Sequence, residues 1–364
     1  MTGIILHVRQ GFEDDAAKEL IDHLNQIGIS ETIPMISQTD SALVVASLSV
    51  NALAKARANL KFCDLVFARQ LLWSSGKVNL PISGDRITPL IDCIRDILLP
   101  MSGSNAFSGV NFETPDTDSS KELSGFCKSL TRPLETGLNK LRLLPKGKGA
   151  SHLPRIHLVM LSNIEVAVAL ADVKNASPWS MGIPRLKFPP QAPSRSTLKL
   201  EEAFHVFLGP DGIKQHLRSG MTGVDLGACP GGWTFQLVKH GIHTIAVDNG
   251  SIDSKLMSTG LVTHLREDAF RYRPHEMVDW LVCDVVEQPS RITELMIDWI
   301  IHDYCQAMIF NLKLPMKKRY EETVNCLKQL EESCARAGKS VHVRAKQLYH
   351  DRKEVTVYVS ISKA

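Results

Sequence analysis

The chain has 364 residues, of which 44% are hydrophobic and 22% charged, and its net charge is +3. This composition is typical of a soluble globular protein, and the length predicts two or three domains. A net charge this small neither requires nor excludes a nucleic-acid partner, so local clusters of charge must decide.

The cysteines and the first residues narrow the class of protein further. Eight cysteines without a closely spaced pair argue against a zinc ribbon or a disulfide framework, so we expect reduced thiols and no metal site. The first residues lack a basic start and a long apolar run, and no stretch approaches the length of a membrane span. We therefore expect a cytoplasmic protein that does not enter the membrane.

Short strands and helices alternate in the first half of the chain. Strands are predicted at residues 4–8, 41–48, 62–73, 156–160 and 165–170, and helices at residues 14–27, 51–60, 87–98 and 120–141. Asn51 stands where the second helix would take its N-cap. The apolar face of the first helix is expected to consist of Ala17, Leu20, Ile21 and Leu24. This interleaving predicts an α+β region over residues 1–177.

The second half has a different organisation. Residues 178–193 are rich in proline, glycine and basic residues, and we interpret them as an ordered linker. Residues 194–364 alternate regularly, which predicts an α/β domain with a doubly wound sheet. A short turn at residues 350–352 joins the last two strands, so the sheet is expected to end in an antiparallel hairpin. The predicted strands lie at residues 222–226, 243–248, 279–284, 306–312, 341–347 and 354–361.

A glycine-rich turn follows the first strand of this domain and precedes a helix. Its sequence over residues 225–233 is Asp-Leu-Gly-Ala-Cys-Pro-Gly-Gly-Trp. Glycine lets the backbone approach a ligand closely, and the helix that begins there presents free N–H groups. About 20 residues later the next strand ends at Asp248, where a carboxylate can bind both hydroxyls of a ribose. The sequence therefore predicts a nucleoside-containing cofactor at the carboxyl edge of the sheet.

The same turn separates two classes of cofactor. A dinucleotide-binding turn has the spacing Gly-x-Gly-x-x-Gly and holds a pyrophosphate. Here Pro230 removes one N–H donor inside the turn, and the glycines are Gly227, Gly231 and Gly232. This pattern favours S-adenosylmethionine, which carries no phosphate, over NAD, and the terminal hairpin also favours a methyltransferase sheet. An NAD-dependent oxidoreductase remains the alternative.

Charged residues stand at the ends of the later strands. Asp268 follows the third strand region and can bind an adenine amino group or close a turn. Asp284 ends an apolar strand and is expected to face the ligand cleft or to cap the following helix. Lys313 ends the next apolar strand, so it can pair with Asp284 and act as a base, or it can be a solvated surface lysine.

Basic residues gather in three places, which favours a track for RNA phosphates over a set of solvated surface charges. The first set surrounds a turn containing glycine and proline, the second lies at the linker, and the third follows Lys313. Together they are Lys140, Arg142, Lys146, Lys148, Arg155, Arg185, Lys187, Arg195, Lys317 and Lys318.

The glycine-rich turn and four charged residues resemble the FtsJ-type ribose 2′-O-methyltransferases. Those enzymes carry a Lys-Asp-Lys-Glu tetrad after a Ser-x-x-Lys motif that begins here at Ser196, and the tetrad corresponds to Lys199, Asp284, Lys313 and Glu354. Taken alone, Lys199 and Glu354 would be ordinary surface residues, and Asp351 is close enough in sequence to compete with Glu354. The N-terminal half resembles a THUMP-containing RNA-binding region, over about residues 55–175.

The resemblance implies a Rossmann-like class I methyltransferase that uses S-adenosylmethionine to methylate a cytidine ribose in 23S rRNA. It implies that Lys313 takes the proton of the 2′-hydroxyl, with Lys199 as a neighbouring cation and Asp284 and Glu354 holding both amines. It also implies a monomer that acts before subunit assembly. A non-catalytic RNA-binding or assembly factor with this fold remains a further alternative. The implied cofactor contacts are Ser196, Gly227, Cys229, Pro230, Gly231, Gly232, Trp233, Asp248, Asp268 and Asp284.

Overall fold

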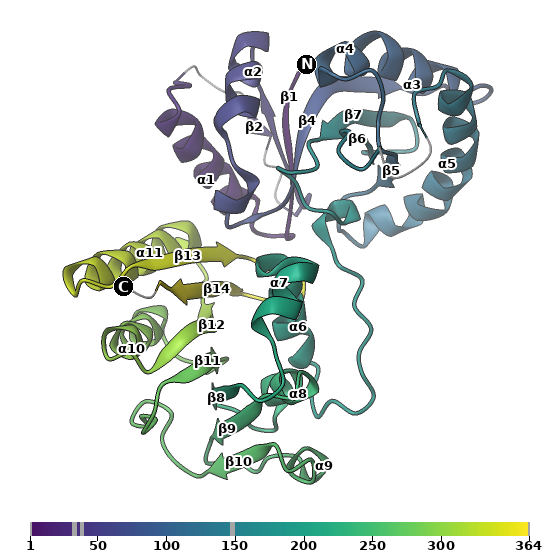
Figure 1. Cartoon of the computed structure of the whole chain (residues 1–364). Helices are drawn as coiled ribbons and strands as arrows, with labels where there is room; N and C mark the ends of the chain where they lie inside the picture. Colours follow the sequence, from purple (N-terminus) through teal and green to yellow (C-terminus); the bar gives the residue numbers. More distant parts are fainter. Residues whose placement is uncertain (1, 31–34, 37–39, 146–149, 363–364) are drawn as a thin grey trace. The chain divides into compact units, whose positions relative to one another are not determined.

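The computed structural model describes residues 2–30, 35–36, 40–145 and 150–362. The chain forms two compact units, Met1–Pro184 and Arg185–Ala364, and each contains its own sheet (Figure 1). The division falls inside residues 178–193, the stretch expected to be a linker.

The first unit is built on one mixed sheet of seven strands in the order β2-β3-β1-β4-β7-β6-β5. Neighbouring strands are antiparallel, except that β5 and β6 are parallel. The longest strand, β4, pairs with β1 through its first half and with β7 through its second, so it joins the two halves of the sheet. The strands are β1 (Gly3–Val8), β2 (Met35–Ile36), β3 (Leu43–Ser47), β4 (Ala68–Asn79), β5 (Val110–Glu113), β6 (Arg155–Met160) and β7 (Glu165–Ala171).

Within the described residues of this unit, five α-helices accompany the sheet. Two of them, α1 and α2, lie beside the half that contains β1 to β3, and the other three lie beside the half that contains β5 to β7 (Figure 1). A π-helical turn at Ile94–Leu98 joins α3 to α4. The helices are α1 (Glu13–Gln26), α2 (Val50–Asn59), α3 (Thr88–Cys93), α4 (Leu99–Ser102) and α5 (Leu123–Lys140).

Two predictions about the first helices are wrong. Ile21, expected on the apolar face of the first helix, is 39% exposed. The N-cap of α2 is Ser49 and not Asn51, because the Ser49 hydroxyl accepts the N–H of Ala52 at 3.2 Å while its own backbone is extended.

The strand predicted at residues 62–73 is displaced toward the C-terminus and begins at Ala68. Two features interrupt the apolar run before it. The segment Phe62–Asp64 forms a 3₁₀ turn, and the buried Glu19 carboxylate accepts the N–H groups of Val66 and Phe67 at 2.5 and 2.9 Å. Those two donors are therefore unavailable to a strand ladder at this point.

The start of the predicted linker is packed against the sheet of the first unit. The Gln70 side-chain amide donates to the carbonyl oxygens of Ser177 and Trp179 at 3.1 and 3.2 Å. Gly182 has a φ of +70°, and a Cβ at this position would lie 1.9 Å from the Arg69 carbonyl oxygen. Only glycine fits there. The segment up to residue 184 is thus an ordered part of the first unit.

The second unit has a seven-stranded sheet in the order β10-β9-β8-β11-β12-β14-β13. Its pairs are parallel except those made by β14, which is antiparallel to β12 and β13. The predicted α/β class with a terminal antiparallel hairpin is confirmed. The sequence did not predict β10, which is a four-residue edge strand. The strands are β8 (Thr222–Leu226), β9 (His243–Val247), β10 (Val262–Leu265), β11 (Val278–Cys283), β12 (Cys305–Lys313), β13 (Val341–Lys346) and β14 (Glu354–Ile361).

In the described part of this unit, α6 and α7 precede the first strand, and α8 to α11 lie between successive strands. The strand order reverses at β8, which has β9 on one side and β11 on the other. Such a reversal opens a ligand crevice at the carboxyl ends of the strands. The helices are α6 (Thr197–Phe207), α7 (Gly209–His216), α8 (Gly232–Lys239), α9 (Ser254–Met257), α10 (Pro289–Ile301) and α11 (Arg319–Arg336).

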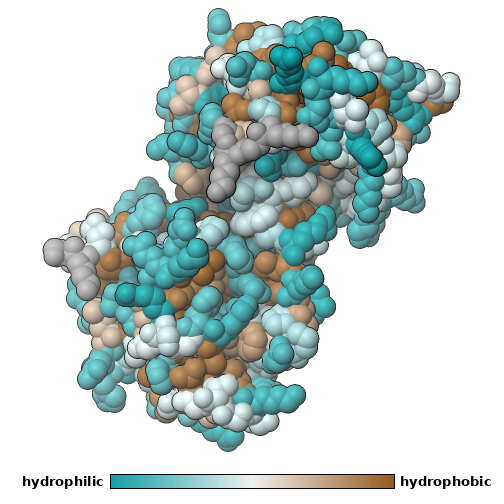
Figure 2. All heavy atoms as spheres, turned by 45° about the vertical axis from the view of Figure 1, so that its right-hand side comes forward, coloured by the Kyte–Doolittle hydropathy of each residue, from teal (hydrophilic) through white to brown (hydrophobic). Residues whose placement is uncertain are grey.

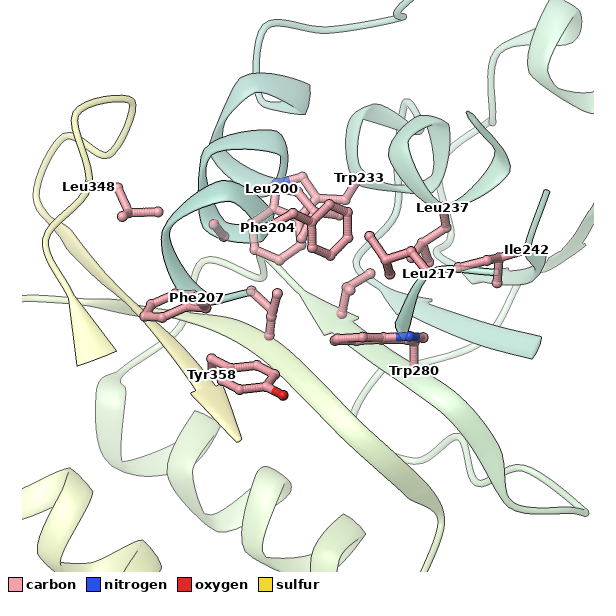
Figure 3. Packing of buried hydrophobic residues seen from close by; sticks show 13 residues of the cluster. Leu200, Phe204, Phe207, Leu217, Trp233, Leu237, Ile242, Trp280, Leu348 and Tyr358 are labelled. Atoms are coloured by element: carbon pink, nitrogen blue, oxygen red, sulfur yellow. The ribbon is translucent and has the colours of Figure 1, made fainter. Parts of the chain in front are cut away.

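An aromatic core fixes α6 and α8 against the sheet (Figure 3). The rings of Phe204 and Trp280 meet edge to face with their centroids 5.9 Å apart, and Phe207 stacks on Tyr358 of β14 at 5.8 Å. Burying an aromatic side chain of this kind contributes about 1.5–3 kcal/mol. The helix that carries Lys199 is therefore held in place by its own apolar face.

Among the described residues, no helix is long and apolar enough to cross a membrane. The same part of the chain contains no group of three or more His, Cys, Asp or Glu side chains that could hold a metal ion. Figure 2 shows hydrophilic side chains over much of the visible face, interrupted by smaller hydrophobic groups.

Candidate active site

The glycine-rich turn connects β8 to α8, and its glycines are required by the backbone and by packing. Gly227 and Gly231 have φ values of +74° and +113°, in the left-handed region that favours glycine. A Cβ on Gly227 would lie 2.5 Å from Cγ2 of Val285, and one on Gly231 would lie 2.6 Å from Cδ2 of Leu256. The turn therefore lies tightly against the segments after β11 and β9.

Asp248 follows β9 and ties the end of that strand to the glycine-rich turn. Its Oδ2 accepts the N–H of Cys229 at 3.0 Å, and its Oδ1 accepts the N–H of Gly250 at 2.7 Å. A carboxylate oxygen has two lone pairs, so each oxygen keeps one acceptor position. These two acceptor positions fit the two hydroxyl donors of a ribose.

Two further residues expected to contact the cofactor, Asp268 and Ser196, differ in exposure and in their contacts. The Asp268 side chain is 53% exposed, its Oδ1 accepts the N–H of Phe270 at 2.8 Å, and its Oδ2 lies 3.7 Å from Arg271 Nε in an exposed ion pair. The Ser196 hydroxyl lies 2.6 Å from that of Ser194, and a Cβ on Gly232 would meet it at 2.2 Å. Ser196 thus packs on the first turn of α8.

Trp233 is placed differently from the other turn residues. Its side chain is 3% exposed and belongs to the aromatic core (Figure 3). Any contact of Trp233 with a cofactor would therefore have to come from its backbone.

Asp225, the fourth residue of β8, is a buried acid at the base of the turn. It is 1% exposed, and its Oδ2 accepts the Thr234 hydroxyl proton at 2.6 Å. Burial raises the pKa of Asp225 to about 7, against the lowering effect of the hydrogen bonds from Thr234. The folded chain therefore binds a proton here more tightly than the unfolded chain does.

This acid makes the stability of the free protein depend on pH. A raised pKa contributes stability that is complete below the unfolded value near 4 and is lost as pH rises through about 7. Asp225→Asn should remove this loss. For the difference between the folded and unfolded pKa values of Asp225, the free energy of unfolding would fall by at most about 4 kcal/mol between pH 4 and pH 8. Thermal unfolding of both proteins across that range measures it. If the stability of the wild type and of the variant changed with pH in the same way, the raised pKa of Asp225 would be contradicted.

The four tetrad residues meet at the carboxyl edge of the sheet. Asp284 follows β11, Lys313 ends β12, Glu354 begins β14, and Lys199 lies in the first turn of α6. Lys313 donates to Asp284 Oδ1 and its Nζ lies 3.7 Å from Glu354 Oε1. Lys199 donates to Glu354 Oε1, and to Asp284 Oδ2 at 3.4 Å. Each amine therefore contacts both carboxylates.

The tetrad is mostly shielded from water, which strengthens these interactions. Side-chain exposure ranges from 9% for Glu354 to 19% for Lys313. Burial alone lowers the pKa of Lys199, but the charges of Asp284 and Glu354 outweigh burial and raise it above the ordinary lysine value. Lys199 is therefore a permanent ammonium group that shares its two carboxylate partners with Lys313.

Comparison with known proteins agrees with this geometry. Three family models match the chain. Residues 1–72 match the model described as RlmM ferredoxin-like domain, and residues 85–172 match the N-terminal model of ribosomal RNA large subunit methyltransferase M. Residues 192–361 match the FtsJ-like methyltransferase model. Ribosomal RNA large subunit methyltransferase M of Methylococcus capsulatus is 44% identical over 361 residues, which cover 99% of this chain and 98% of that protein. The chain belongs to the family of ribosomal RNA large subunit methyltransferase M.

A second relative of the same name, from Pseudoalteromonas translucida, is 40% identical over 366 residues, covering 100% of this chain and 98% of that protein. The resemblance to FtsJ-type methyltransferases is confirmed. The first unit matches two models of its own family, and its THUMP-like character remains a prediction. Among solved structures, TrmN from Thermus thermophilus matches with a TM-score of 0.37 and 15% identity over 100% of both chains.

Sequence reasoning missed a layer of buried polar residues beneath the tetrad of this methyltransferase. The Asn311 amide donates to Asp284 Oδ1 at 2.8 Å, and the Asn311 carbonyl accepts the Thr356 hydroxyl proton at 2.7 Å. Thr356 Oγ1 also lies 2.9 Å from Asp351 Oδ2. A signal was present, because Asn311 interrupts an apolar strand two residues before Lys313.

The structure also distinguishes Glu354 from Asp351. Glu354 contacts both lysines of the tetrad, whereas Asp351 accepts the N–H of Leu348 at 3.0 Å and lies against Thr356. The choice of Glu354 as the fourth tetrad residue therefore fits the contacts.

The candidate RNA-binding residues lie in both units. In the first unit Lys140 and Arg142 are exposed and Arg155 is half-buried at the start of β6, while Lys146 and Lys148 lie outside the described residues. The remaining five belong to the second unit. All five are exposed, and none has an ion-pair partner in the described part of the chain: Arg185, Lys187, Arg195, Lys317 and Lys318.

Proposed function

We propose that this chain transfers a methyl group from S-adenosylmethionine to the ribose 2′-hydroxyl of a cytidine in 23S rRNA. The observation that carries the proposal is the alternating contact of two lysines with two carboxylates at the carboxyl edge of the methyltransferase sheet. A protein that only binds RNA does not need such a cluster, because burying paired charges adds little stability, whereas shielded charge clusters are typical of catalytic sites.

Lys313 is the proposed general base. Its neutral amine would accept the proton of the 2′-hydroxyl, while Asp284 and Glu354 orient the nitrogen from two sides. Lys199 keeps its proton, because both carboxylates raise its pKa, so it neutralises the carboxylates and acts as the fixed cation of the cluster. The deprotonated oxygen would then bond to the methyl carbon as the carbon–sulfur bond breaks, and S-adenosylhomocysteine would be the leaving group. Most of the rate gain in such a transfer comes from positioning the two reactants.

S-adenosylmethionine would supply the electrophilic methyl group. We assign its ribose to Asp248, whose two oxygens each keep an acceptor position, and its adenine to Asp268, whose exposed side chain is only loosely paired with Arg271 through Oδ2 at 3.7 Å. The backbone of the turn at Gly227, Cys229 and Pro230 would form the wall against the rest of the molecule. These assignments rest on the shared carboxyl edge of β8, β9 and β11.

The substrate assignment is supported by the family. The two relatives described above are named as ribosomal RNA large subunit methyltransferases and match along almost their whole length. We propose a cytoplasmic enzyme that acts on 23S rRNA before the subunit is assembled. We also propose a monomer, because one chain provides all four tetrad residues. Methyl transfer to 23S rRNA but not to 16S rRNA, both stripped of protein, tests the substrate class.

RNA binding is expected to depend on the exposed basic residues. Replacing Lys140, Arg142, Arg185 and Lys187 by glutamine should weaken binding and reduce the slope of log affinity against log salt. Each lost phosphate contact should lower that slope by about 0.7–0.9. The loss should be similar for 23S and unrelated RNA, because phosphate contacts carry no base identity.

Filter binding over a salt series measures this slope. A control variant replaces Lys77 and Lys239, which already pair with Glu165 and Glu201 at 2.9 Å, and it should leave the slope unchanged. A slope equal to that of the wild type in the fourfold variant would mean that these charges are only solvated.

A further inference from the structure

A second pair of polar residues lies directly behind the catalytic pair in the β12–β14 ladder. Lys313 is opposite Glu354, and two residues further along, Asn311 is opposite Thr356. Residues two apart on a strand point to the same face of the sheet. Asn311 and Thr356 are both fully buried, so they form an inner layer to which the outer Lys313–Glu354 pair is joined.

Hydrogen-bond donors and acceptors in this layer can be assigned in only one order. The carboxylate of Asp284 only accepts, so the Asn311 atom 2.8 Å from its Oδ1 is the amide nitrogen. The Asn311 oxygen must then accept at 2.7 Å from the Thr356 hydroxyl, which has a single proton. Because the single hydroxyl proton of Thr356 is donated to Asn311, Thr356 cannot donate a second hydrogen bond. The 2.9 Å contact of Thr356 Oγ1 with Asp351 Oδ2 is therefore a hydrogen bond only if Asp351 donates it.

Asp351 has the surroundings of a neutral carboxylic acid. It is 1% exposed, and the charged groups that act on it include Glu202 and Lys199 of α6 and Glu354 of β14. Burial, followed by the two glutamates, raises the pKa of Asp351 well above its ordinary value. A protonated Asp351 can donate to Thr356, which completes the order inferred from the geometry.

We propose that Asp351, Thr356 and Asn311 are positioning residues: a one-directional hydrogen-bond chain from Asp351 through Thr356 and Asn311 fixes the Asp284 carboxylate between Lys199 and Lys313. The chain ends on the same oxygen, Asp284 Oδ1, to which Lys313 donates. It thereby sets the position of the general base, and this role rests on the proposed function of Lys313. Displacing a catalytic group by about 1 Å can cost on the order of 100-fold in rate.

The isosteric variant Thr356→Val tests the chain at its centre. Valine keeps the shape and the β-branched side chain but removes the hydroxyl. We expect kcat for methyl transfer to fall on the order of 10- to 100-fold, with KM for rRNA and affinity for S-adenosylmethionine within about twofold. Thr356→Ser keeps the hydroxyl and should restore kcat to within a few-fold of wild type. Asn311→Ser, which is too short to bridge Thr356 and Asp284, should resemble Thr356→Val, and it serves if the valine variant does not fold.

Two further variants separate positioning from general damage. Thr293→Val removes another buried hydroxyl of the same unit, which donates to the Pro289 carbonyl at 2.9 Å in α10, and should leave kcat unchanged. Asp351→Asn keeps a neutral donor toward Thr356, but its amide nitrogen cannot also accept the Leu348 N–H, so kcat should fall less than in Thr356→Val. Wild-type kcat in both Thr356→Val and Asn311→Ser would overturn the proposal, as would an equal loss in Thr356→Ser. Absence of methyl transfer by the wild type would instead refute the proposed function.

Discussion

Lys313→Ala is expected to lower methyl transfer by about 10²- to 10⁴-fold, the range that a positioned general base contributes. The amine contacts the carboxylates of Asp284 and Glu354 at the carboxyl edge of the sheet, where a 2′-hydroxyl would have to lie. Affinity for S-adenosylmethionine should stay within about twofold, because Lys313 acts on the hydroxyl. Single-turnover transfer with labelled cofactor measures the first quantity and calorimetry measures the second.

A matched control for this variant is Lys339→Ala. Lys339 also belongs to the second unit, pairs with a carboxylate, that of Asp303, at 2.5 Å and is 23% exposed on its side chain. Its loss should leave methyl transfer unchanged. Turnover in Lys313→Ala equal to that of this control would remove Lys313 from the mechanism, and a parallel loss of cofactor binding would make its role structural.

Asp248→Ala is expected to weaken S-adenosylmethionine binding by about 2–4 kcal/mol, which corresponds to a roughly 30- to 900-fold rise in Kd. The variant loses the carboxylate assigned to two ribose hydroxyls. It also frees the N–H groups of Cys229 and Gly250, which hold the glycine-rich turn to the end of β9. Isothermal titration calorimetry measures the change.

Asp253→Ala is the control that separates loss of the ribose contact from loss of backbone hydrogen bonds. Asp253 caps α9 in the same unit, and its Oδ1 accepts two backbone N–H groups, those of Lys255 and Leu256, at 2.9 and 3.2 Å. It has no assigned contact with the cofactor, so its loss should change Kd by less than about threefold. If Asp248→Ala binds S-adenosylmethionine as tightly as this control, the ribose assignment is wrong.

The sequence predicted the parts of the site that local pattern determines. Asp284 and Lys313 end apolar strands that are neighbours in a doubly wound sheet, so their meeting follows from parallel pairing of β11 and β12. Lys199 and Glu354 carry no such signal. Their place depends on the packing of α6 against the aromatic core and on the antiparallel return of β14, and only the family resemblance pointed to them.

Side-chain hydrogen bonds explain what the sequence could not predict. Glu19 takes two N–H groups that would otherwise extend β4, and Ser49 takes the cap expected of Asn51. Neither partner can be read from strand or helix periodicity, because the Glu19 contact joins residues more than 40 positions apart and the Ser49 cap depends on a backbone dihedral. The hydrogen bonds that link Thr356, Asn311 and Asp284 beneath the tetrad cannot be predicted from the sequence for the same reason.

The most direct test of the proposed chemistry is to map the methyl group on its product. Purified enzyme, labelled S-adenosylmethionine and 23S rRNA that lacks the modification are incubated together, and the labelled nucleotide is identified after digestion. The Lys-Asp-Lys-Glu contacts predict label on a ribose 2′-oxygen and not on a base, and the family resemblance predicts that the nucleotide is a single cytidine. Label on a base, or on the ribose of another nucleotide, would contradict the assignment of Lys313 to a cytidine 2′-hydroxyl.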